Sequence, residues 1–136
     1  MTVLNGSCLC GSVKYVLEGG VGDITYCHCA MCRKAHGSAF GAYARVVSPE
    51  SFKFVTGEDL VRRHRSSADV TRTFCGECGS NLQFIRDGRP TFSIAVGSLD
   101  SDPNTRPSAQ IWTRDKAPWH EITGNMPCFQ EFPIRK

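Results

Sequence analysis

The chain has 136 residues and a formal net charge of +3, with 40% hydrophobic and 21% charged residues. This length predicts one compact domain over residues 1–136. The Lys and Arg residues are scattered, which argues against nucleic acid as a partner, and no apolar run approaches the roughly 18 residues of a membrane span. The first residues lack the basic region and apolar core of a signal peptide, so we expect a cytoplasmic protein without a membrane partner.

Short β-strands dominate the predicted elements. Residue type and alternation predict strands at 13–18, 24–26, 39–47, 51–55, 60–65, 70–74, 81–85 and 90–96, the last four as two consecutive pairs. One helical turn is predicted at 33–36, and prolines predict turns beyond Gly97. Since no segment has a sustained 3.6-residue apolar period, the predicted fold class is all-β, with short antiparallel sheets and at most short helical turns.

The eight cysteines fall into groups with the spacing of metal ligands. The groups are Cys8 and Cys10; Cys27, Cys29 and Cys32; Cys75 and Cys78; and a single Cys128. Four disulfides in a secreted domain are the alternative interpretation. The Cys-x-Cys pairs are too constrained to bridge themselves, however, and the spacing is unlike that of a disulfide framework. We therefore interpret the cysteines as metal ligands.

Four of these thiols balance as one structural zinc site. Cys75 and Cys78 form a knuckle that supplies only two ligands, and Cys8 and Cys10 supply two more. Such a site would join the N-terminal strand to the middle of the chain and contribute directly to folding.

The remaining group, Cys27, Cys29 and Cys32, leaves a tetrahedral metal one ligand short. Three protein ligands and an open position are typical of a catalytic zinc rather than a structural one. Cys128 could supply a fourth ligand and make this site structural as well. The preferred interpretation of Cys128 is a buried free thiol.

Five segments together resemble one protein family. They are Gly6–Tyr15, Cys27–Lys34, Arg72–Ser80, Gly97–Asp100 and Lys116–Trp119. In residue types and order these segments resemble the glutathione-dependent formaldehyde-activating enzyme family, which is shared with centromere protein V and has an Mss4-like all-β fold. The resemblance implies two zinc ions per chain, a structural one on Cys8, Cys10, Cys75 and Cys78 and a catalytic one on Cys27, Cys29 and Cys32.

The resemblance also implies a carbon–sulfur lyase-type activity, the formation or cleavage of S-hydroxymethylglutathione from formaldehyde and glutathione. An open zinc position suits a substrate thiol, which would bind as the thiolate beside the aldehyde carbon. Arg33 and Lys34 are candidates to bind the carboxylates of glutathione. His28 and His36 are candidate proton shuttles, although His28, between two ligands, is expected to point away from the metal.

Other aromatic and basic residues receive structural interpretations. Trp112 and Trp119 are expected in the core, His120 is expected to be packed or at the surface, and the basic run 62–65 is expected to form a solvated strand and loop.

Three alternative functions stay open: a non-catalytic zinc-binding interaction module, a thiol redox or metal-buffer protein, and an enzyme acting on another thiol adduct. The sequence leaves open whether the chain forms a homo-oligomer.

Overall fold

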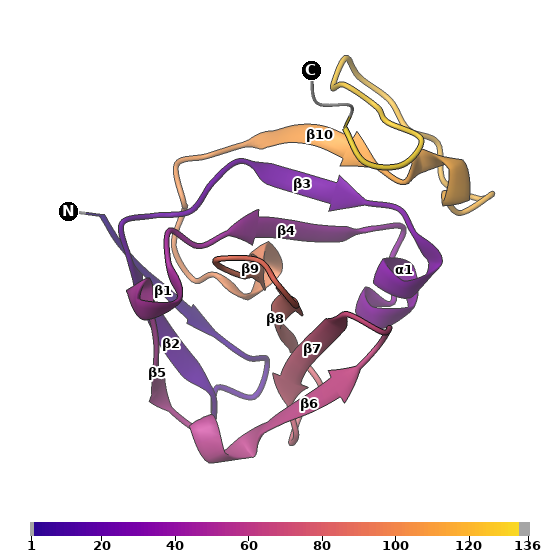
Figure 1. Ribbon diagram of the computed structural model, residues 1–136. Coiled ribbons are helices and arrows are strands. Elements are labelled where there is room, and N and C mark those ends of the chain that lie inside the picture. Colours follow the sequence, from indigo (N-terminus) through magenta and orange to yellow (C-terminus); the bar gives the residue numbers. More distant parts are fainter. Residues whose placement is uncertain (1, 134–136) are drawn as a thin grey trace.

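The computed structural model describes residues 2–133, which form short strands and one short α-helix (Figure 1). The strands are β1 (Val3–Ser7), β2 (Lys14–Glu18), β3 (Ile24–Cys27), β4 (Gly41–Arg45), β5 (Phe52–Thr56), β6 (Val61–Arg65), β7 (Val70–Cys75), β8 (Asn81–Arg86), β9 (Ser93–Ala95) and β10 (Pro107–Ile111). The helix, α1, spans Ala30–His36. The predicted fold class is confirmed.

The strands form two sheets. The smaller has the order β1-β2-β5, and the larger has the order β10-β3-β4-β9-β8-β7-β6. Both predicted pairs are confirmed, because β6 pairs with β7 and β8 with β9 in antiparallel register. Beyond Gly97, where turns were predicted, one strand was missed: β10 pairs with β3, and this pair is parallel. Pro107 opens β10 at the edge of the sheet, where a residue without an N–H is tolerated.

The hydrophobic core contains residues of both sheets. Leu17 and Phe52 come from the smaller sheet and Leu82 from the larger one, and all three are buried. Tyr15 adds a ring that crosses Gly6 on the neighbouring strand, where a Cβ at Gly6 would lie 2.1 Å from the Cζ atom of Tyr15. Glycine is therefore the residue that lets β1 approach this aromatic side chain.

The helix α1 starts earlier than the single turn predicted at 33–36. Cys29 is its N-cap, and the Cys29 sulfur accepts a hydrogen bond from the amide of Cys32 at 3.4 Å. A thiolate here does what the oxygen of Ser or Asp does at most helix starts, so residue type did not reveal the boundary. Gly37, with φ at 58°, ends the helix in the left-handed conformation.

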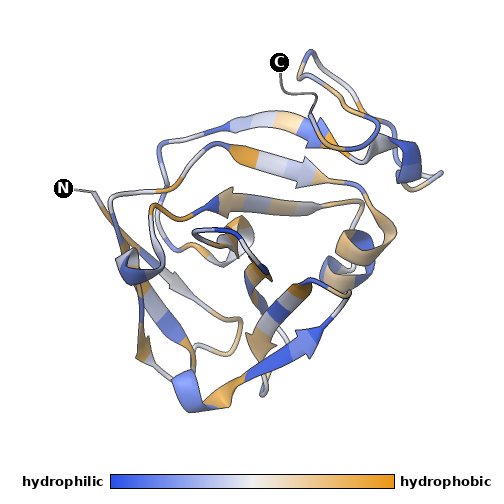
Figure 2. Cartoon of the chain, in the orientation of Figure 1, coloured by the Kyte–Doolittle hydropathy of each residue, from blue (hydrophilic) through white to orange (hydrophobic). Residues whose placement is uncertain are grey.

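The basic run at residues 62–65 forms most of β6, the outer strand of the larger sheet. All four side chains are exposed, as predicted, and the strand is strongly hydrophilic (Figure 2). Among residues 2–133, no helix has the length and apolar character needed to cross a membrane.

Candidate metal centres and active site

Four cysteines meet at the junction of the two sheets. The sulfurs of Cys8, Cys10, Cys75 and Cys78 all lie within 4.8 Å of one another. The distances are 3.6 Å between Cys8 and Cys10 and 3.9 Å between Cys10 and Cys75. Four sulfurs placed tetrahedrally about 2.3 Å from a zinc ion would lie about 3.8 Å apart. This group therefore fits a metal ion.

The four-thiol group connects chain segments that are distant in sequence. Cys8 and Cys10 lie in the turn after β1, whereas Cys75 ends β7 and Cys78 lies in the following turn. Hydrogen bonds from the Ser80 side chain and backbone lower the pKa of Cys78 to about 5. That shift favours the thiolate, the form that binds metals.

A second group of three thiols forms where β3 meets α1. Cys27 ends β3, Cys29 caps α1 and Cys32 lies in its first turn, and the three sulfurs lie within 4.8 Å of one another. Cys128 does not belong to this group. Its thiol is exposed and donates to the carbonyl oxygen of Met126 at 3.4 Å, so the expectation that Cys128 is buried was wrong.

Hydrogen bonds among the three thiols favour the thiolate form of Cys29. Hydrogen bonds from Cys27 and Cys32 lower the pKa of Cys29 to about 2. The pKa of Cys27 is raised, mainly because its thiol shares a hydrogen bond with Cys29. This arrangement therefore favours a thiolate at Cys29, with Cys27 as its hydrogen-bond donor.

Arg72, on β7, supplies the positive charge beside these sulfurs. Its side chain is buried, and its Nη2 donates to the sulfur of Cys32 at 3.6 Å. The other guanidinium nitrogens donate to the hydroxyls of Tyr43 at 2.7 Å and Ser66 at 3.0 Å. The guanidinium also lies 5.0 Å from the ring centre of Phe84. A buried cation needs a compensating charge, and here the thiol group provides it.

Tyr43 connects Arg72 to His36. The Tyr43 hydroxyl lies 2.6 Å from Nε2 of His36, at the end of α1. Burial, and then the charge of Arg72, lower the pKa of His36, so its ring is neutral near pH 7 and, as the Nε2–H tautomer, can donate a hydrogen bond to the Tyr43 oxygen. His36, one of the two candidate shuttles, is thus linked to the three-thiol group by two side chains.

A cavity of about 1320 Å³ lies against the three-thiol group. Side chains of the larger sheet, α1 and the C-terminal segment line it. They include Cys27, Cys29, Cys32, Tyr43, Arg45, Arg72, Phe84, Arg86, Arg89, Phe92, Trp112 and Phe132. None of the four other metal-binding thiols is among the described residues that line this cavity. Of the two thiol groups, the three-thiol group therefore lines this cavity and the four-thiol group lies outside its lining.

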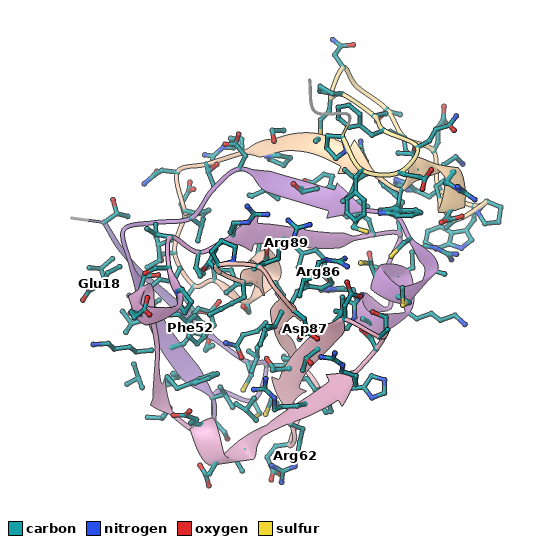
Figure 3. The ribbon with its side chains drawn as sticks, viewed as in Figure 1. Glu18, Phe52, Arg62, Arg86, Asp87 and Arg89 are labelled. Atoms are coloured by element: carbon teal, nitrogen blue, oxygen red, sulfur yellow. The ribbon has the colours of Figure 1, made fainter. Side chains whose placement is uncertain are left out.

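The cations that line the cavity are arginines that sequence reasoning missed. Arg45 lies on β4, and Arg86 and Arg89 lie at the end of β8 and in the turn after it (Figure 3). Arg33 and Lys34, the predicted glutathione contacts, lie on α1 and are not among the described lining residues. Sequence distance hid the arginines, because only strand pairing brings β4 and β8 to the same cavity.

The two tryptophans and His28 also have defined places. Trp119 is 71% exposed and Trp112 lines the cavity, so the expectation that both lie in the core was wrong. His28 is buried, its Nε2 lies 2.5 Å from Oε1 of Gln110 and its ring stacks on His120. His28 therefore contacts β10, and His120 is packed as expected.

Comparisons with known proteins identify relatives of this chain. An uncharacterized lyase of Schizosaccharomyces pombe is 26% identical over 139 residues, covering 100% of this chain and 97% of that protein. A crystal structure of a Rhodobacter sphaeroides protein matches with a TM-score of 0.56 and 25% identity, covering 76% of this chain and 99% of the other. The family model for the glutathione-dependent formaldehyde-activating enzyme matches residues 3–115, which hold both metal-binding thiol groups. The chain belongs to the glutathione-dependent formaldehyde-activating enzyme family.

Proposed function

We propose that this protein is a zinc-dependent carbon–sulfur lyase-type enzyme that forms or cleaves the adduct of glutathione and an aldehyde. The observation that carries the proposal is the position of Cys27, Cys29 and Cys32 in the wall of a large cavity. The family and the lyase relative support the reaction class, with S-hydroxymethylglutathione as the family's named adduct. Eight free thiols support a reducing, cytoplasmic location.

The proposed reaction joins a thiol to a carbonyl carbon. A sulfur–carbon bond forms, the carbonyl double bond becomes a single carbon–oxygen bond, and the thiol proton passes to that oxygen. Cys27, Cys29 and Cys32 would hold the zinc ion, which would act as a Lewis acid and lower the pKa of a substrate thiol. In the reverse direction the same proton leaves the hydroxyl and the carbon–sulfur bond breaks.

Arg72 and Tyr43 are the side chains that we assign to charge and proton handling. A zinc ion with three thiolates has a charge of −1, and the guanidinium of Arg72 beside Cys32 offsets this charge. With Arg72 beside it, the zinc site would repel an incoming anionic thiolate less than it would without this guanidinium. The Tyr43 hydroxyl lines the same cavity, so it can donate a hydrogen bond to the developing alkoxide, with His36 behind it.

The charge of the cavity fits an acidic thiol such as glutathione. Four arginines and three aspartates are among its described lining residues. Asp69 pairs with Arg86 at 2.7 Å, whereas Arg45 and Arg89 make no ion pair within residues 2–133. We assign the carboxylates of glutathione to Arg45 and Arg89, and keep Arg33 and Lys34, within α1, as a second candidate pair.

Cys29→Ser tests the proposal directly. Loss of one thiolate from the three-thiol group should reduce turnover of glutathione and formaldehyde by at least about a hundredfold, because the metal loses a ligand and its geometry. The far-UV circular dichroism spectrum and the zinc of the four-thiol site should be retained. Cys128→Ser is the matched control, since this exposed thiol lies outside both groups. Unchanged turnover in Cys29→Ser, or a variant that does not fold, would contradict a catalytic role.

A further inference from the structure

The C-terminal segment at residues 127–133 is fixed along β10 by backbone hydrogen bonds (Figure 1). The amides of Gln110 and Trp112 donate to carbonyls of this segment at 2.9 and 3.0 Å, and the carbonyl of Gln110 accepts from the amide of Phe129 at 2.8 Å. The family match ends at residue 115. The segment is therefore an ordered part of the fold that lies beyond the residues matched by the family model.

The segment places the ring of Phe132 beside Trp112 in the cavity lining. Phe132 packs edge-on against Trp112, with ring centres 5.4 Å apart, and both side chains line the cavity. The guanidinium of Arg86 lies 5.7 Å from the centre of the Phe132 ring. We refer to Trp112 and Phe132 together as the aromatic wall.

The aromatic wall combines an exposed side chain with a strained backbone. Half of the Phe132 side chain remains accessible. Trp112 has a backbone φ of 57°, in the left-handed region that bulky residues rarely occupy. Strained residues of this kind persist where the surrounding structure holds them, and they concentrate at ligand sites. The wall thus presents a fixed apolar surface to whatever fills the cavity.

Glutathione with a hydroxymethyl group does not match this surface. The peptide is polar, and formaldehyde adds only one carbon and one oxygen to it. The cavity volume of about 1320 Å³ is also above the roughly 300–1,000 Å³ that is common for small-molecule sites. An aromatic ring, in contrast, gains from stacking against Trp112 and Phe132.

We propose that the aromatic wall selects adducts in which the carbonyl-derived part is a large aromatic group. The inference rests on the proposed function, because it names the aldehyde class that would join glutathione in the same cavity. The acidic thiol part lies toward Arg45 and Arg89, its sulfur reaches the three-thiol group, and the aromatic part contacts the wall. The bond changes are those given above, with an aromatic aldehyde in place of formaldehyde.

Binding of two stable thioethers to the zinc-loaded protein tests the inference without turnover. S-benzylglutathione carries an aromatic group where the carbonyl-derived part would lie, and S-methylglutathione is its small counterpart. Isothermal titration calorimetry should give a dissociation constant at least about tenfold lower for the benzyl compound. Phe132→Ala should remove most of this preference, because it weakens binding of the benzyl compound more than binding of the methyl compound. Trp119→Ala, which removes an exposed aromatic ring outside the cavity lining, should retain the preference.

Equal affinity for the two compounds, or an unchanged preference in Phe132→Ala, would overturn the inference. Parallel turnover assays with glutathione and either formaldehyde or benzaldehyde separate this result from the proposed function. Turnover of formaldehyde without a benzyl preference would reject the aromatic wall as a selector and keep the lyase-type activity. A benzyl preference that depends on Phe132, in a protein that turns over neither aldehyde, would support the wall and reject the activity.

Discussion

At the scale of single residues, Arg72 is the most informative side chain. It is buried, it makes no ion pair with a carboxylate among residues 2–133, and it donates to the sulfur of Cys32. An isolated buried charge costs several kcal/mol unless it is compensated. Its presence therefore indicates that the three-thiol group is anionic in the folded protein, as it is when its thiolates hold a metal ion.

His36 provides a prediction about pH. Its pKa is lowered by burial and then by Arg72, whereas an unfolded chain has a histidine pKa near 6.5. As pH falls through that value toward the lower folded pKa, the unfolded chain binds a proton that the folded chain does not. The free energy of unfolding must therefore fall over this window and level off below the folded pKa.

Urea unfolding of zinc-loaded protein between pH 7.5 and 5.5 measures this effect. His36→Gln should lose less stability on acidification than the unsubstituted protein. His64→Gln, which replaces an exposed histidine on β6, should follow the unsubstituted protein. Parallel pH dependence for His36→Gln and the unsubstituted protein would show that His36 is not the half-buried neutral histidine inferred from its contacts.

At the scale of elements, the contact between α1 and β4 sets the position of Tyr43 and His36. Gly41 opens β4 opposite Cys27, and a Cβ there would lie 2.7 Å from Cε2 of Tyr43 and 2.8 Å from Cδ2 of His36. Gly41→Ala should lower the free energy of unfolding by about 1–3 kcal/mol and reduce kcat, since both side chains must shift. Gly97→Ala is the control, because a Cβ there meets no atom within 4 Å. Equal stability and kcat in the two variants would contradict this packing.

The same elements show how far sequence reasoning reached. The spacing of the thiols revealed both groups, because ligand spacing is local and its chemistry is specific. The start of α1 was missed because a cysteine sulfur serves as its cap, and β10 was missed because its proline and polar residues resemble a turn. Arg45, Arg72 and Arg89 could not be assigned to the cavity, since only the pairing of β4, β7, β8 and β9 brings them to it.

At the scale of the whole molecule, the two thiol groups divide the work of the fold. The four-thiol group lies where the two sheets meet, and none of its ligands belongs to β3 or α1, which carry the three-thiol group. We expect its metal ion to contribute to folding, as structural zinc does in small domains. The three-thiol group instead lies at the cavity, where loss of a metal ion should leave the sheets intact.

We infer that the four-thiol site fills the coordination of its metal ion, whereas the three-thiol site leaves one position for a substrate thiol. Zinc per chain, measured with and without excess glutathione alongside a count of reactive thiols, tests it most directly. We predict two zinc ions per chain, of which glutathione perturbs one, with Cys128 as the readily reactive thiol. Cys29→Ser should lose the glutathione-sensitive zinc and keep the other. A single zinc ion that glutathione leaves unchanged, with Cys27, Cys29 and Cys32 reacting as free thiols, would contradict the account.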